Sequence, residues 1–326
     1  MEQRALGRTG RDVSVIGLGT WQLGADWGEV DEAAAVSVLD AAAESGVTVF
    51  DTADVYGDGR SESIIGGWLS RHPEWGGTVL TKMGRRLPQE PENFSAANFR
   101  AWVDRSRRNL RLDTLPLVQL HCPPSSVYAD GAVYEALDAL VEDGSIAAYG
   151  VSVEREAEAL AALAHPGVQS VQIILNAFRL KPLDRVLPAA AESRTATIAR
   201  IPLASGLLSG RYTETTTFAP SDHRTFNREG AAFDRGETFS GVDFAEGVAA
   251  AREFAALAPE GVTPAQAAIR WIVDRPGVTT VIPGARSPEQ ARANASAADA
   301  TLPPDFDGRV RELYDRRFRA AIHPRY

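Results

Sequence analysis

The stretch VTVFDTADVYGDGRSESIIG, residues 47–66, shows the pattern that recurs along this chain, an apolar run that ends in a polar residue. It opens with a short apolar run rich in β-branched residues, Asp51 ends that run, and Tyr56 follows five residues later. Two other apolar runs end in the same way, TVLTK at Lys82 and LPLVQLH at His121. Runs of this length and composition predict β-strands. If the strands are parallel neighbours, their carboxyl ends meet at one rim, so we expect these four side chains to share a pocket.

Apolar runs and amphipathic helices alternate along most of the chain. Eight runs have strand character: IGLGT (16–20), VTVFD (47–51), TVLTK (78–82), LVQLH (117–121), SIAAYGVS (145–152), VQSVQIIL (168–175), TATIARIP (195–202) and TTVIP (279–283). Asp31 and Ser95 are expected N-caps of two of the helices between them. This α/β alternation predicts a (β/α)8 TIM barrel. An open doubly wound sheet is the alternative, and the lack of a G-x-G-x-x-G segment after an early strand disfavours it.

Three segments do not follow the repeat. Residues 4–19 predict a β-hairpin around the turn-rich GRTGRD. Residues 213–242 are too long for a routine connection and are a candidate active-site loop. Residues 303–326 predict an extra charged helix and a tail. No shift of composition marks a boundary, so we expect a single domain over residues 1–326.

Composition and charge narrow the function classes. The chain has 326 residues, 44% of them hydrophobic, which supports one large core, and its net charge of −9 disfavours a nucleic-acid partner. The single cysteine, Cys122, excludes an internal disulfide and a multi-cysteine metal site. No apolar run reaches the length of a signal peptide core or a membrane span. We therefore expect a cytoplasmic protein with no membrane partner and no metal; its oligomeric state stays open.

The four strand-end residues form a chemically coherent set. A tyrosine keeps its proton to a pKa of about 10. A neighbouring ammonium such as Lys82 would lower that pKa, and the Asp51 carboxylate would keep the ammonium charged. A neutral His121 could donate a hydrogen bond to a substrate oxygen. The set suits proton delivery to a carbonyl oxygen while a hydride arrives at carbon, although each residue alone is more often structural.

In order and spacing, the motifs resemble those of the aldo-keto reductase family over nearly the whole chain. The matching segments are LGRTGRDVSVIGLGTWQLG (6–24), DTADVYGDGRSESIIG (51–66), TKMGRR (81–86), LVQLHCPP (117–124), IPLASGLLSGRY (201–212) and VIPGARSPEQARANASA (281–297). The resemblance implies a TIM barrel that binds a nicotinamide cofactor. It assigns the family's catalytic tetrad to Asp51, Tyr56, Lys82 and His121, with Tyr56 as the general acid.

The last of these segments has its own physical logic. Ser287 and Gln290 match a capping box with Pro288 at the first helical position, and such a helix start offers free N–H groups to an anion. The resemblance implies that Arg286 contacts the 2′-phosphate, which favours NADPH over NADH. The expected cofactor-binding residues are Gly19, Thr20, Trp21, Ser152, Gln172, Arg200, Leu203, Ser205, Gly206, Leu208, Gly284, Arg286, Gln290 and Asn294.

The chain departs from the family pattern around the expected nicotinamide position. Val153 follows Ser152 where an asparagine is frequent, and Arg200 stands where many relatives carry an aromatic ring. Cys122 replaces a tryptophan that often follows the histidine and is expected to pack as a small apolar residue. The expected substrate pocket consists of Trp21, Trp27, Met83 and Cys122.

These residues predict an NADPH-dependent reductase of an aldehyde or ketone, a small-molecule carbonyl that the sequence does not identify. The alternative is a nicotinamide-binding redox sensor or regulatory subunit with little turnover, which the complete tetrad disfavours. A Schiff-base role for Lys82 would need a neutral amine, and the Asp51 carboxylate works against that.

Overall fold

A computed structural model describes residues 1–24 and 31–326. Among them, eight parallel strands form one sheet in the order β10-β9-β8-β7-β6-β5-β4-β3. The sheet closes on itself, because the Gly17 N–H donates to the Val281 carbonyl at 2.8 Å and the Gly19 N–H to the Pro283 carbonyl at 3.0 Å. The predicted TIM barrel is confirmed, and the open-sheet alternative is excluded by this closure.

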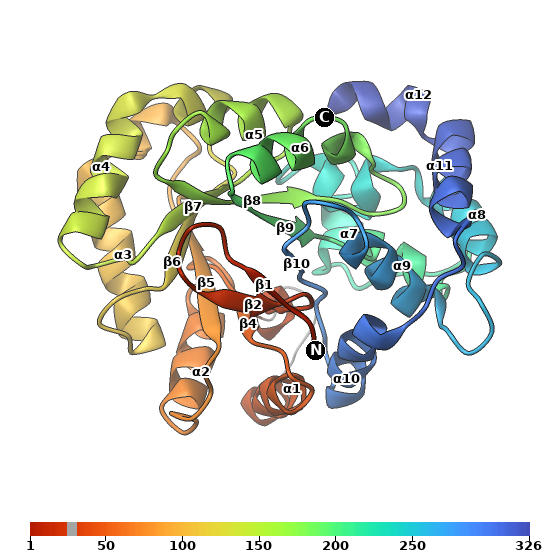
Figure 1. Ribbon diagram of the computed structural model, residues 1–326, viewed down its shortest axis with the longest axis horizontal. Helices are drawn as coiled ribbons and strands as arrows, with labels where there is room; N and C mark the ends of the chain where they lie inside the picture. Colours follow the sequence, from red (N-terminus) through yellow and green to blue (C-terminus); the bar gives the residue numbers. More distant parts are fainter. Residues whose placement is uncertain (25–30) are drawn as a thin grey trace.

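Each strand of the eight-stranded sheet corresponds to one of the eight predicted runs. The strands are β3 (Leu18–Gly19), β4 (Val49–Asp51), β5 (Thr78–Met83), β6 (Leu117–His121), β7 (Tyr149–Ser152), β8 (Val168–Ile174), β9 (Ala196–Arg200) and β10 (Thr280–Val281), except that β5 extends one residue beyond its run. The helices outside them are α1 (Glu32–Glu44), α2 (Arg60–Leu69), α3 (Ala96–Leu110), α4 (Gly131–Glu142), α5 (Glu156–Leu163), α6 (Val186–Glu192), α9 (Pro264–Val273) and α10 (Pro288–Ala295) (Figure 1).

Side-chain caps set the starts of the outer helices. Asp31 accepts a hydrogen bond from the Ala34 N–H at 2.7 Å and begins α1, and Ser95 accepts from Asn98 and begins α3. Both were predicted as N-caps, and each satisfies a backbone donor that the helix leaves unpaired.

The N-terminal hairpin closes one end of the barrel. Its strands β1 (Gln3–Ala5) and β2 (Asp12–Ser14) pair antiparallel, as the turn-rich sequence predicted, and lie across the centre of the strand ring in Figure 1. Leu6 and Val13 are fully buried. They pack in one cluster with barrel side chains, namely Val49, Leu80, Leu117, Ala148, Ala196, Ile198 and Ile282. The carboxyl ends of the strands are thus left as the end that can hold a site.

The remaining helices follow β9 and β10. They are α7 (His223–Phe226), α8 (Phe244–Ala255), α11 (Phe306–Arg317) and α12 (Arg319–Ile322). The 3-10 helices are η1 (Trp21–Gly24), η2 (Pro91–Asn93), η3 (Ser125–Ala129), η4 (Lys181–Leu183), η5 (Ala204–Ser209), η6 (Arg235–Glu237), η7 (Phe239–Gly241), η8 (Ser296–Asp299) and η9 (His323–Arg325). The loop 213–242 therefore carries α7, η6 and η7. In the described part of the chain, no helix is long and apolar enough to cross a membrane.

Candidate active site

Strand register brings the predicted residues to one level of the barrel. Asp51 is the last residue of β4 and pairs with Gly19 of β3, while His121, Ser152 and Gln172 pair in a row across β6, β7 and β8. All five lie at the carboxyl ends of their strands, opposite the hairpin. The clustering follows from the parallel arrangement, because the carboxyl ends of all eight strands lie on the same side of the barrel.

Lys82 is the centre of the polar contacts. Its ammonium donates to Asp51 Oδ1 at 2.5 Å, to the Thr52 carbonyl at 2.8 Å and to Tyr56 Oη at 3.4 Å. The side chain of Lys82 is 1% exposed and that of Asp51 3%. Gln172 donates across the barrel to the second Asp51 oxygen at 2.8 Å. Both carboxylate oxygens and the three ammonium protons therefore have partners, as a buried ion pair requires.

Burial and charge act in opposite directions on Lys82 and Tyr56. Burial disfavours the Lys82 ammonium, but Asp51 and Tyr56 outweigh it and raise the pKa of Lys82 above its usual value. The pKa of Tyr56 is also raised, because burial of the phenol exceeds the lowering effect of Lys82. The sequence led us to expect a lowered tyrosine pKa, and the difference arises from burial, which charge spacing alone does not reveal. The Tyr56 phenol is consequently protonated at neutral pH.

His121 is held neutral. Burial first, and then the charges of Arg85, Lys82 and Arg200, put the pKa of its imidazole well below the usual value. Its ring stands edge-on to Tyr56, with ring centroids 5.9 Å apart and planes at 81°. Its buried Nδ1 has no hydrogen-bond partner among the described residues. A neutral imidazole beside the Tyr56 phenol can donate a hydrogen bond to an oxygen without competing for its proton.

A cavity of about 620 Å³ opens above these residues. Its lining includes Asp51, Tyr56 and His121 together with most of the expected cofactor residues, namely Gly19, Thr20, Trp21, Gln172, Arg200, Leu203, Ser205, Gly206, Gly284, Arg286, Gln290 and Asn294. Lys82 lies beneath, in contact with Asp51 and Tyr56. The cavity runs from the strand ends to the start of α10, so that a long ligand could touch both.

The far end of the cavity suits an anion. Ser287 caps α10 by accepting from the Gln290 N–H at 3.3 Å. The Gln290 side chain accepts from the Arg286 N–H at 2.9 Å, one residue earlier than the capping box predicts. This bond holds the backbone of Arg286 at the helix start, while its side chain lines the cavity. Arg211, which the sequence did not single out, lines the same end and adds a second guanidinium.

The backbone conformation at Gly206, in the segment SGLLSG (205–210), requires a glycine. Gly206 has φ of +98°, in the left-handed region, and a Cβ there would lie 2.2 Å from the Tyr212 hydroxyl. The residue therefore allows the η5 turn and the close approach of Tyr212 to the cavity wall.

Several predicted residues lie outside the cavity lining. Met83 is 1% exposed and belongs to the hydrophobic core between barrel and helices, since the side chain that follows Lys82 along β5 points to the opposite face. Leu208 is also fully buried in the core. Cys122 and Ser152 are not in the lining and contact each other, with the Cys122 Sγ 3.4 Å from the Ser152 Oγ. Burial raises the pKa of the Cys122 thiol to about 11. Trp27 lies outside the described residues.

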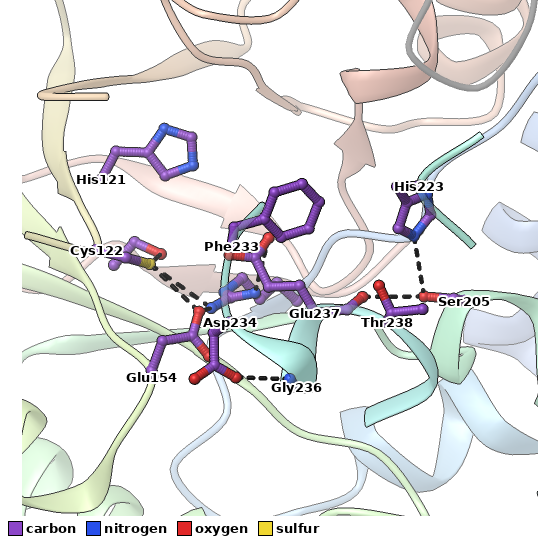
Figure 2. A network of polar contacts seen from close by, with 12 residues as sticks. His121, Cys122, Glu154, Ser205, His223, Phe233, Asp234, Gly236, Glu237 and Thr238 are labelled. Carbon is purple, nitrogen blue, oxygen red and sulfur yellow. Dashed lines mark hydrogen bonds and ion pairs between the residues drawn. The ribbon is translucent and has the colours of Figure 1, made fainter. Parts of the chain in front are cut away.

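A cluster of charged side chains contains Arg85, Glu154, Arg200 and Glu237 and reaches Cys122 through Glu154 and Arg200. Three of the four are buried, and Arg85 is partly exposed. Figure 2 shows Cys122, Glu154 and Glu237 of this region. Arg200 makes a short ion pair with Glu154 and donates to the Val153 carbonyl at 3.2 Å. These two contacts fix the Arg200 guanidinium, which stands at the position where the sequence predicts contact with the nicotinamide. The sequence analysis did not identify Glu237 individually. It identified only the long loop 213–242, which contains Glu237, as a candidate active-site loop.

The same loop covers Trp21 with two rings. The His223 ring lies 4.8 Å from the Trp21 ring and the Phe233 ring 5.9 Å from it, while Tyr56 stacks with Trp21 at 5.9 Å. Burial lowers the pKa of His223 to about 4, so this imidazole packs as a neutral ring. The loop therefore supplies an apolar wall next to Tyr56, a role that sequence analysis gave to Trp27, Met83 and Cys122 instead.

Comparisons with known proteins agree with this geometry. The model of the Aldo/keto reductase family matches residues 15–315. Aldo-keto reductase YhdN of Bacillus subtilis is 28% identical, covering 100% of this chain and 97% of YhdN. The glycerol dehydrogenase AKR11B4 of Gluconobacter oxydans is similar in structure, with a TM-score of 0.77, 29% identity and coverage of 94% and 93%. An aldo-keto reductase of Klebsiella pneumoniae in complex with NADPH shares the fold, with a TM-score of 0.71, 23% identity and 96% coverage of both chains.

Proposed function

Because the chain belongs to the aldo/keto reductase family, we propose that it reduces an aldehyde or ketone to the alcohol with NADPH, and that Tyr56 is the general acid. The observation that carries the proposal is the ammonium of Lys82, which reaches both Asp51 Oδ1 and Tyr56 Oη at the cavity floor. NADPH, when bound, supplies the hydride.

Tyr56 would give its proton to the carbonyl oxygen of the substrate. The phenolate that remains would then lie 3.4 Å from an ammonium whose charge Asp51 maintains. An opposite charge at that distance in a buried site stabilises the phenolate. Burial keeps Tyr56 protonated before the reaction, and Lys82 limits the energetic penalty of its ionisation.

His121 would orient the substrate. Its neutral ring stands next to Tyr56, so a carbonyl oxygen can accept from both groups at once. Trp21 and Phe233 would hold the apolar part of the substrate beside them. In this pose the carbonyl carbon would lie over the cavity floor, with the apolar rings limiting the access of water.

The cavity would hold NADPH in an extended form. Arg286 and the start of α10 suit the 2′-phosphate, and Arg211 adds a positive charge there. Gln172 and Arg200 line the opposite end, where the nicotinamide would lie. The guanidiniums at the anion end support a preference for NADPH over NADH.

The test is a screen of aldehydes and ketones that follows NADPH absorbance, with NADH as the control. Wild type should turn over NADPH with a higher kcat/KM than NADH. Tyr56→Phe should lower kcat by about 10²–10⁴-fold, the usual contribution of a general acid. Its NADPH affinity, measured by protein fluorescence, should change little.

Tyr134→Phe is the matched control, since the Tyr134 hydroxyl is buried but donates to the Tyr128 carbonyl, away from the cavity. It should leave kcat unchanged. Tight NADPH binding by wild type without turnover of any carbonyl would contradict the proposal and favour a sensor. Loss of NADPH binding in Tyr56→Phe would contradict the role of Tyr56.

A further inference from the structure

Glu237 is a buried carboxylate delivered to the cavity by the loop 213–242. It ends η6, is 7% exposed, and is one of the residues that line the cavity. Burial disfavours its charge, but Arg85 and Arg200 outweigh burial and lower the pKa of Glu237 to about 2. The residue is therefore a fixed negative charge next to the proposed reaction centre.

Arg85 joins this carboxylate to His121. One guanidinium nitrogen, Nη2, donates to Glu237 Oε1 at 2.8 Å, and Nε donates to the His121 backbone carbonyl at 3.1 Å. Both hydrogen bonds come from one planar guanidinium, so the direction of the bond to Glu237 restricts the direction of the bond to His121. The backbone of His121 at the end of β6 is thus linked to a loop 116 residues further along the chain.

The backbone of Glu237 makes a second link, toward the expected cofactor segment. Ser205 Oγ in η5 donates to the Glu237 carbonyl at 3.1 Å. The remaining Glu237 oxygen, Oε2, lies 3.9 Å from Arg200 Nη1. Figure 2 shows Glu237 between His121 on one side and Ser205 on the other. Glu237 therefore contacts Arg85, which holds the backbone of His121, and Ser205, which belongs to the expected cofactor segment.

We propose that Glu237 is a positioning residue, which orients His121 through Arg85 and aligns it with the cofactor segment at Ser205. This inference rests on the proposed carbonyl reduction. Glu237 does not transfer a proton. It keeps the Arg85 guanidinium in place. Arg85 holds the His121 carbonyl, and its charge adds to the burial that keeps the imidazole neutral.

The first experiment compares Glu237→Gln with Glu229→Gln. Glu229 is in the same loop, but its side chain is 73% exposed and forms an ion pair with Arg235, away from Arg85. Glu237→Gln should lower kcat about 10- to 100-fold, the size of effect expected when a positioning group is misplaced by about 1 Å. Its NADPH dissociation constant should stay within about 3-fold of wild type, a change below 1 kcal/mol. Glu229→Gln should match wild type in both.

The second experiment uses Arg85→Gln and the pH profile of kcat/KM. The groups that face His121 are Arg85 and Lys82 from the β5 side, Arg200 from β9 and Tyr56. Removing the Arg85 charge should raise the pKa of His121, so that the imidazole is protonated at higher pH. The acid limb of the profile should then move toward neutral pH. A merely structural loss would lower the whole profile without moving this limb.

The outcomes separate the two proposals. If wild type reduces no carbonyl with NADPH, the proposed function fails. If wild type is active and Glu237→Gln behaves like Glu229→Gln, the role of Glu237 is overturned. If Glu237→Gln does not fold, Glu237→Asp and Arg85→Gln decide. An unmoved acid limb in Arg85→Gln, or full activity of a folded Glu237→Asp with a lost Arg85 contact, overturns the proposal as well.

Discussion

The strand-end rim and the loop 213–242 both line the cavity, but they are held in place by different physics. Asp51, Lys82 and His121 belong to strands, so the hydrogen-bonded ladder determines where each side chain lies. Phe233 and Glu237 belong to a segment of short helices, where contacts with distant residues such as Trp21 and Arg85 take the place of a strand ladder. The rim carries the proposed proton chemistry, whereas the loop shapes and aligns the space around it.

Lys82→Met should have the largest effect, because it breaks the rim at its centre. It leaves the Asp51 carboxylate buried without its main partner, which typically costs about 3–5 kcal/mol of unfolding free energy. Carbonyl reduction should fall by at least about 10²-fold, since the phenolate of Tyr56 loses its cation. Urea unfolding and steady-state kinetics measure the two effects.

Lys181→Met is the matched control for stability. Lys181 makes two long ion pairs, at 3.9 Å with Glu156 and 3.8 Å with Asp184, and it is partly exposed. Such a pair contributes about 0–1 kcal/mol. The double variant Asp51→Asn/Lys82→Met should regain stability without regaining activity. Recovery of activity in the double variant would sink the role of the ion pair in catalysis.

Phe233→Ala tests the loop and should have an intermediate effect. It removes the ring that packs at 5.9 Å on Trp21, so the apolar wall next to Tyr56 is opened. We expect KM for the carbonyl substrate to rise about 10-fold, which corresponds to about 1.4 kcal/mol, while kcat changes less. Val141→Ala, at a 37% exposed position of α4 outside this loop, is the control. Equal KM values for the two variants would show that the loop does not shape the substrate pocket.

Asp54→Asn should have the smallest effect on carbonyl reduction, and it should change the pH dependence of stability. Asp54 is fully buried, and its two oxygens lack hydrogen-bond partners among the described residues. Burial, with a smaller contribution from Glu62, raises its pKa from 3.8 to about 7. Native protein thus keeps a proton that the unfolded chain releases above pH 4. Stability falls as pH rises through this window, by at most about 1.4 kcal/mol per pH unit.

The variant removes this titration, so Asp54→Asn should gain stability relative to wild type between pH 5 and pH 8, as measured by urea unfolding. Glu237 provides the contrast. Its pKa is lowered to about 2, and the stability from its pairing is present above the unfolded value and lost only as pH falls toward 2. Glu237 itself therefore stays ionised between pH 5 and pH 8, and its own charge contributes the same stability at both pH values. A stability difference between Asp54→Asn and wild type that does not vary with pH would contradict the buried state of Asp54.

Local pattern was sufficient for the barrel and for the rim. Apolar runs of strand length, helix caps such as Asp31 and the polar residues that end each run are all properties of a few neighbouring residues, and parallel pairing then brings the strand ends together. Tertiary packing decided the rest. Arg85 meets Glu237 across 152 residues of sequence, and the pKa of Tyr56 rises because burial exceeds the effect of its charged neighbour. Neither follows from spacing, because burial and the pairing of distant charges exist only once the whole chain has folded.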